Sequence, residues 1–119
     1  METKETKMTV QRIKLNEKES LAIAQRYYSL LSAIGNSSLT EREIQLMAFT
    51  AIKGNISYSI NREEFCNLYK SSSPTINNII SKLKKQGLLV KDGGKIKVNP
   101  LYLLNFENDI TLQISLLHG

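Results

Sequence analysis

The stretch of sequence that most restricts the fold spans residues 72–98 and reads SSPTINNIISKLKKQGLLVKDGGKIKV. Ser72 or Ser73 can cap a helix, and Pro74 then falls at its first position, where the missing N–H costs no hydrogen bond. Apolar residues recur at helical spacing, which predicts a buried stripe formed by Ile76, Ile79, Ile80 and Leu83. Gly87 tolerates the left-handed backbone that ends many helices. The first part of the stretch therefore predicts one helix that closes just before that glycine.

The second part of the same stretch predicts a β-hairpin. Residues 88–91 and 95–98 flank the sequence Asp-Gly-Gly at residues 92–94. These turn residues supply the positive φ angles that a tight hairpin turn requires. A helix followed directly by a hairpin is therefore expected here.

Three helices are predicted upstream, over residues 17–34, 40–53 and 61–69. Each begins with a capping box, in which a polar cap residue is followed three positions later by glutamate: Asn16 and Glu19, Thr40 and Glu43, and Asn61 and Glu64. Between the second and third helices, residues 56–60 alternate between two faces and predict a short strand. One face of the second helix is expected to be buried and to consist of Ile44, Met47, Ala48, Ala51 and Ile52.

The N-terminal segment, residues 1–15, is expected to lie outside this helical part. Residues 1–7 are charged and predict a solvated tail, whereas the imperfect alternation of residues 8–15 indicates a strand. The main domain is therefore assigned to residues 16–106.

The C-terminal segment, residues 107–119, is expected to form a strand. Alternation over residues 110–117 predicts one aliphatic face, formed by Ile110, Leu112, Ile114 and Leu116. The apolar residues 101–106 that precede it suit either a helical turn or an extended arm.

The formal net charge is +5, and most of the excess lies in one block. Residues 1–65 hold nine basic and eight acidic side chains, whereas residues 66–106 hold seven lysines against Asp92. Residues 107–119 add two acidic side chains. A basic block inside a folded segment is expected of a phosphate-binding face, although lysines also keep small domains soluble.

The order helix, strand, helix, tight turn, helix and hairpin resembles the winged helix-turn-helix superfamily, and most closely its multiple-antibiotic-resistance regulator (MarR) type. The resemblance is carried by LTERE at residues 39–43, NREEF at 61–65, the expected recognition helix within 72–89, and VKDGGKIKV at 90–98 as the wing. VNPL at residues 98–101 is also similar to winged-helix plasmid and phage replication initiators. The resemblance implies an α+β, mainly α fold, in which a winged helix-turn-helix gains an N-terminal helix and a C-terminal strand or arm.

The resemblance also implies that the partner is double-stranded DNA, bound without catalysis in transcription regulation or replication. Ser72, Ser73 and Thr75 would offer hydroxyl donors to a phosphate at the helix N-terminus, where the dipole is positive. Asn77 and Asn78 would reach base edges, and asparagine can pair with adenine through two hydrogen bonds. The alternative is that a serine only caps the helix and that the asparagines only face solvent.

Further DNA contacts are expected downstream. They are Ser81, with lysines that would grip phosphates as point charges: Lys82, Lys85, Lys95 and Lys97. Lys84 is expected to be solvated, and Asp-Gly-Gly is expected to serve the turn alone.

A second interpretation is a structural component of a large assembly, such as a bacteriophage virion, which uses the same fold to bind protein. Neither the expected recognition helix nor the hairpin contains an arginine, whereas DNA-binding family members usually carry one at the wing tip. The aliphatic face of the terminal strand and the side of the first helix with Tyr27 and Tyr28 are expected to contact other subunits. The terminal strand is expected to pair either with the strand over residues 8–15 or with a neighbouring subunit's sheet. A small core leaves little room to bury both surfaces within one chain.

The residues indicate no enzyme, metal, cofactor or small-molecule substrate. Cys66 is the single cysteine, which excludes an intrachain disulfide, fits a reducing compartment and is usual for a small core residue. His118 is the single histidine, and no Gly-rich phosphate loop or Cys/His metal spacing occurs. No apolar stretch approaches the ~20 residues of a membrane span, and residues 1–7 lack a secretory signal. A cytoplasmic protein is expected, or one of the host cytoplasm and then the virion in the second interpretation.

Overall fold

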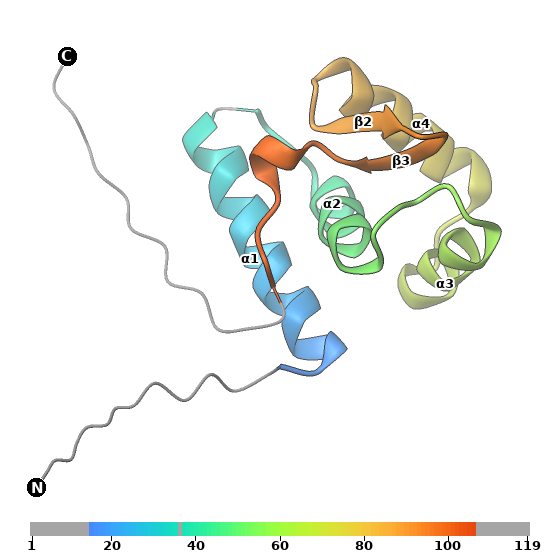
Figure 1. Cartoon of the computed structure of the whole chain (residues 1–119), viewed down its shortest axis with the longest axis horizontal. Coiled ribbons are helices and arrows are strands. Elements are labelled where there is room, and N and C mark those ends of the chain that lie inside the picture. Colours follow the sequence, from blue (N-terminus) through green and yellow to red (C-terminus); the bar gives the residue numbers. More distant parts are fainter. Residues whose placement is uncertain (1–14, 36, 107–119) are drawn as a thin grey trace, which may run out of the picture.

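The structure is a computed structural model, and it describes residues 15–35 and 37–106 (Figure 1). In this part the chain is mainly helical with a small antiparallel sheet, as the expected α+β, mainly α class requires. The elements in chain order are α1 (Glu17–Gly35), α2 (Glu41–Lys53), α3 (Ser59–Tyr69), α4 (Ser73–Lys85), β2 (Leu89–Asp92), β3 (Lys95–Val98) and the short 3-10 helix η1 (Pro100–Tyr102). The strand expected over residues 110–117 lies outside the described residues, as does nearly all of the strand expected over 8–15.

Helix α2 lies at the centre of the fold, between α1 on one side and α3, α4 and the hairpin on the other (Figure 1). Five consecutive residues, Leu46 to Thr50, are buried, and they cover more than one face of a helix. The prediction of a single buried stripe was wrong in this respect: Ile44, Ala51 and Ile52 are only half-buried, whereas Leu46 and Phe49 join the core. The pattern fails because α2 packs against neighbours on several sides.

The aromatic side chains of α1 pack inside this same chain. Tyr27 and Tyr28 are 9% and 2% exposed, and both rings contact Phe106, with centroids 5.5 and 5.8 Å away. The Tyr28 hydroxyl donates to the backbone oxygen of Tyr102 over 2.7 Å, and burial raises the pKa of Tyr28, so the hydroxyl keeps its proton. The expectation that Tyr27 and Tyr28 form an oligomer interface is therefore corrected. The arm after η1 covers them, which is a contact between distant parts of the chain.

The segment between α2 and α3 is not the predicted strand over residues 56–60. Only Ile56 pairs with β3, through a 2.9 Å hydrogen bond from its N–H to the Ile96 oxygen, while the Ile96 N–H donates to Ser57 Oγ. The following residues turn into α3, because the N–H groups of Ser57 and Tyr58 donate to the side-chain oxygen of Asn55. This asparagine turn takes the backbone donors that a longer strand would use.

Helix α3 also begins earlier than its predicted cap at Asn61. The cap position is Tyr58, which makes no side-chain capping bond. Asn61 lies inside the helix, and its amide donates to the Asn55 backbone oxygen over 3.0 Å. The capping-box prediction was therefore wrong for this helix.

Caps at the other helices agree with the sequence. Asn16 and Glu19 exchange hydrogen bonds at the start of α1, and Thr40 and Glu43 do so at the start of α2. Ser72 caps α4 through a bond from the Thr75 N–H. These contacts are local, so spacing alone predicts them.

The hairpin forms as predicted, with Leu89 opposite Val98 and Asp92 opposite Lys95. Gly93 and Gly94 make the turn with φ angles of 60° and 80°, which glycine adopts without steric cost. Leu89 and Val98 are buried beneath the hairpin, so it is fixed to the core at its base. Its orientation relative to α4 therefore follows from core packing.

Two lysines tie the helices together through three ion pairs. Lys53 Nζ, at the end of α2, lies 2.9 Å from Glu17 of α1 and 2.8 Å from Glu64 of α3. Lys82 Nζ of α4 lies 2.8 Å from the carboxylate of Glu43, which is 6% exposed. Burial raises the pKa of Glu43, but the hydrogen bonds from Lys82 and from the Thr40 N–H outweigh it and hold the pKa below its ordinary value. Glu43 therefore stays ionised while it closes the α2 cap and holds α4.

Replacing Glu43 with glutamine tests this link. Because the folded-state pKa of Glu43 lies below its ordinary value of 4.5, its contribution is complete above that pH and is lost as the pH falls through the folded-state pKa. We expect E43Q to be about 1–2 kcal/mol less stable than the natural protein at pH 7, and the difference to shrink towards pH 3. Urea unfolding at both pH values measures it. E41Q, the same change at an exposed position of the same turn, is the control, and equal losses in both variants would contradict the assignment.

Candidate nucleic-acid interface

The outward side of α4 is set by its buried side. Ile76, Ile79, Ile80 and Leu83 point into the core, as predicted. At 100° per residue, the opposite side consists of positions i, i+4, i+7 and i+11, which are Pro74, Asn78, Ser81 and Lys85. All four are exposed, and we call them the α4 ridge. The ridge contains two of the predicted DNA-contacting polar residues and one predicted phosphate contact.

The hydroxyl groups at the start of α4 serve the helix itself. Ser72 Oγ lies 3.4 Å from the Thr75 N–H nitrogen and 3.0 Å from Thr75 Oγ1. Two of the three predicted hydroxyl donors are therefore engaged with each other, although both remain exposed. Ser73 is also exposed, and it makes no side-chain hydrogen bond within the part of the chain that the structure describes.

Both flanks of the ridge are tied to neighbouring helices. On one flank, Asn77 Oδ1 accepts a 2.6 Å hydrogen bond from the guanidinium of Arg62 in α3. On the other flank, Lys82 is held by Glu43 of α2 and remains 43% exposed at its side chain. Both predicted contacts thus lie at the surface, but each has an intramolecular partner.

Sequence reasoning did not identify Arg62 as a residue of this surface. It lies on the helix before α4, and its Nε also donates to the Ile56 backbone oxygen over 2.9 Å. Helical periodicity places residues within one helix and says nothing about which residue of α3 faces α4. The one available signal was that Arg62 is the only arginine between residues 43 and 119.

The predicted lysines of the hairpin share one face. Lys95 and Lys97 are two residues apart on β3, with Asp92 and Val90 opposite them on β2. Lys97 Nζ lies 3.7 Å from the Asp92 carboxylate, and both are well exposed, so the pair contributes little and leaves the lysine available. Lys95 Nζ lies 5.3 Å from the Tyr58 ring, and a hydrogen bond with Tyr58 raises the pKa of the ammonium group. This face therefore presents two lysine side chains.

The other residues that the sequence singled out do not belong to the α4 ridge or to the lysine face of the hairpin. Lys84 is exposed, and Cys66 is half-buried and packs against the core, which agrees with its expected role as a small core residue. His118 and the aliphatic side chains of residues 110–117 lie outside the described residues.

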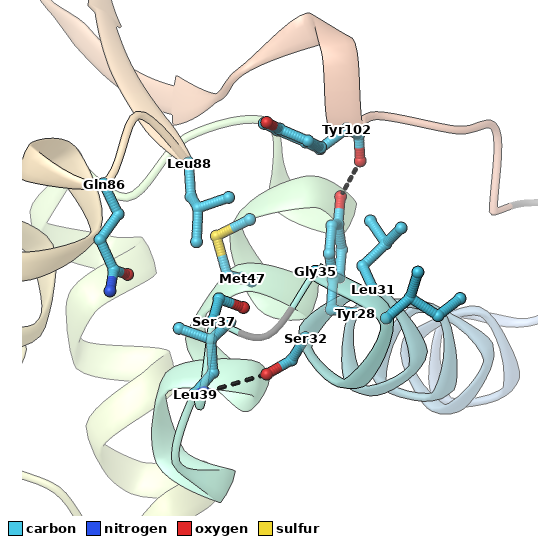
Figure 2. A pocket seen from close by; sticks show the side chains of 11 residues that line it. Tyr28, Leu31, Ser32, Gly35, Ser37, Leu39, Met47, Gln86, Leu88 and Tyr102 are labelled. Atoms are coloured by element: carbon cyan, nitrogen blue, oxygen red, sulfur yellow. Dashed lines mark hydrogen bonds between the residues drawn. The ribbon is translucent and has the colours of Figure 1, made fainter. Parts of the chain in front are cut away.

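An apolar pocket of about 400 Å³ opens between α1, Met47 of α2 and the junction of α4 with β2 (Figure 2). The hydroxyls of Tyr28 and Ser32 at its wall are engaged with backbone groups of Tyr102 and Leu39. None of its eleven lining residues is charged. The pocket therefore offers no cation to a phosphate, whereas lysines lie on α4 and the hairpin.

Within the described residues, no helix has the length and apolarity to cross a membrane, and no group of His, Cys, Asp and Glu side chains is placed to hold a metal ion. Comparisons with protein families, with curated proteins and with solved structures found no match to this chain.

Proposed function

We propose that this chain is a non-catalytic DNA-binding protein, in which residues 40–100 form a winged helix-turn-helix module and α4 enters the major groove. The element order supports this fold: α2, the single paired residue Ile56, α3, α4 and the hairpin follow one another as a winged helix requires. Transcription regulation and replication are the processes that such a module serves.

The observation that carries the proposal is the α4 ridge together with the lysine face of the hairpin. The ridge presents amide, hydroxyl and ammonium groups from Asn78, Ser81 and Lys85, and α4 itself contains no acidic residue. A major groove about 12 Å wide admits a helix, and its floor offers hydrogen-bond donors and acceptors that such side chains recognise. The hairpin lysines then supply charge for neighbouring phosphates.

Phosphate contacts are shared unequally among the lysines. Lys85 lies on the ridge and makes no ion pair within the described part of the chain, whereas Lys82 must partly leave Glu43 to reach a phosphate. Lys95 and Lys97 remain available on the hairpin. Lys85 is therefore the best single position at which to test the proposed surface.

Duplex binding should depend steeply on salt, because each neutralised phosphate releases counterions. Four contacts predict a log–log slope of roughly −3 to −4 per protomer, and K85A should reduce its magnitude by about 0.9. Fluorescence anisotropy of a labelled duplex, titrated across salt concentrations, measures both values.

K18A, which removes an equal charge from the exposed start of α1, is the matched control and should leave the slope unchanged. The proposal fails if the natural protein does not bind duplex DNA at about 50 mM salt, or if K18A and K85A reduce the slope equally.

A second candidate function, as a structural subunit of a large assembly, is favoured by one observation. Leucine side chains are exposed along the arm that follows β3: Leu101 is 82%, Leu103 45% and Leu104 37% exposed. Large exposed apolar patches mark contacts with other molecules, and three leucines within four positions are the start of such a patch. This arm leads directly into residues 107–119.

Deletion of residues 108–119 tests the second candidate. We expect the truncated protein to keep its helical circular dichroism but to lose mass in light scattering, because the terminal aliphatic residues would join subunits. Deletion of the charged residues 1–7 is the control and should leave the mass per particle unchanged. Equal numbers of subunits in the full-length and 108–119-deleted proteins would contradict this function.

A further inference from the structure

Arg62 joins three parts of the fold through its guanidinium group. Its Nε donates to the backbone oxygen of Ile56 over 2.9 Å, and Nη1 donates to Asn77 Oδ1 over 2.6 Å. Ile56 is fully buried and is itself paired with Ile96 of β3. The guanidinium is therefore anchored to rigid backbone before it reaches α4.

This contact fixes the orientation of the Asn77 amide. Arginine has donors and no acceptor, so the amide oxygen must face Arg62 and the NH₂ group must point elsewhere. Asn77 is exposed, so its Nδ2 group is turned towards a partner molecule, whereas Oδ1 keeps a second lone pair but is held facing Arg62. A short bond to a cation is also stronger than one between neutral groups, which makes rotation of the amide unfavourable.

The next residue, Asn78, has an amide that no such hydrogen bond restrains in the described part of the chain. It lies on the α4 ridge, is exposed, and makes no side-chain hydrogen bond within residues 15–35 and 37–106. Its oxygen and nitrogen are both available, as bidentate pairing with adenine requires. The two neighbouring asparagines therefore have different hydrogen-bonding capacity.

The major-groove edges of the purines distinguish these two cases. Adenine presents an acceptor at N7 and a donor at N6, so it needs both ends of an amide. Guanine presents acceptors alone, at N7 and O6. An amide whose oxygen is held against a guanidinium turns its NH₂ end outward, so it is matched to guanine and meets the adenine amino group with another N–H donor.

We propose that Arg62 sets the base specificity of Asn77, so that Asn77 reads guanine while the unrestrained Asn78 reads adenine at a different base pair. The proposal rests on the proposed DNA-binding function. It changes the adenine contact expected for Asn77 from sequence, because Arg62 holds the amide oxygen towards α3 and away from the base that the NH₂ group would meet. Arg62 acts through Asn77 and is a positioning residue.

A selection from a randomised duplex pool with the full-length protein tests the proposal. For the natural protein, we expect a guanine preference at one position of about tenfold over adenine, within the range that one base contact supplies. R62M keeps a long apolar stem but has no donor, so the freed Asn77 amide should prefer adenine at that position. The position read by Asn78 should stay the same.

N77D and N78D form the matched pair of variants. N77D keeps an acceptor for Arg62 but has no N–H donor, so the guanine preference should fall to near unity while the adenine position is retained. N78D should have the reverse effect. If R62M does not give a cooperative thermal transition, N77D and N78D carry the test, since N77D retains the Arg62 contact.

Three results would overturn the proposal, and they are distinguishable. Equal weakening of all sequences by R62M and N77D would show that the pair contacts phosphate. An unchanged base preference in both variants would show that Asn77 does not face the groove. Failure of the natural protein to retain any duplex would reject the proposed function itself, and this inference with it.

Discussion

Water reaches no side of α2 along residues 46–50, and this burial is the constraint on which the other elements depend. Leu46, Met47 and Phe49 are at most 1% exposed, and each contributes about 1.5–3 kcal/mol relative to an exposed side chain. To cover them, α1 must lie along one side of α2 while α3, α4 and β3 lie along the others. The positions of α4 and the hairpin are thus consequences of enclosing one apolar helix. The surface that they present together is fixed before any partner is bound.

Polar contacts then decide which side chains of α4 remain available. Glu43 holds Lys82 on one flank, and Arg62 holds Asn77 on the other. Both contacts involve a charged group, and because Glu43 is buried, leaving its carboxylate unpaired would be costly. The flanks therefore have a stabilising role as well as a surface position. The ridge between them carries the groups whose hydrogen-bonding capacity is not already used.

The sequence predicts the local features well and the features that depend on distant residues poorly. The boxes at Thr40 and Asn16, the Ser72 cap and the glycine turn of the hairpin each involve residues within a few positions, so spacing determines them. The prediction of a strand over residues 56–60 was wrong because the side chain of Asn55 binds the backbone N–H groups that a strand would use. The alternation of apolar residues gives no sign of that contact. The prediction of an oligomer interface at Tyr27 and Tyr28 was wrong because Phe106, about eighty positions further along the chain, covers both rings. At the candidate site, exposure of the α4 residues was predictable from their period, whereas their pairing with Arg62 and Glu43 was not.

The lack of arginine in α4 and the hairpin argues less against DNA binding than the sequence alone suggests. A guanidinium group is brought to the same surface from α3, through contacts with Ile56 and Asn77. Two of its five N–H donors are used in those bonds, and its positive charge is retained. The group differs from an arginine at a hairpin tip, because it is anchored to the core and cannot move far into a minor groove. Its position beside the first half of α4 instead favours an effect on major-groove recognition. Under the proposed function, an anchored arginine would therefore act in a different groove from a mobile one, and charge counts along the sequence do not reveal that difference.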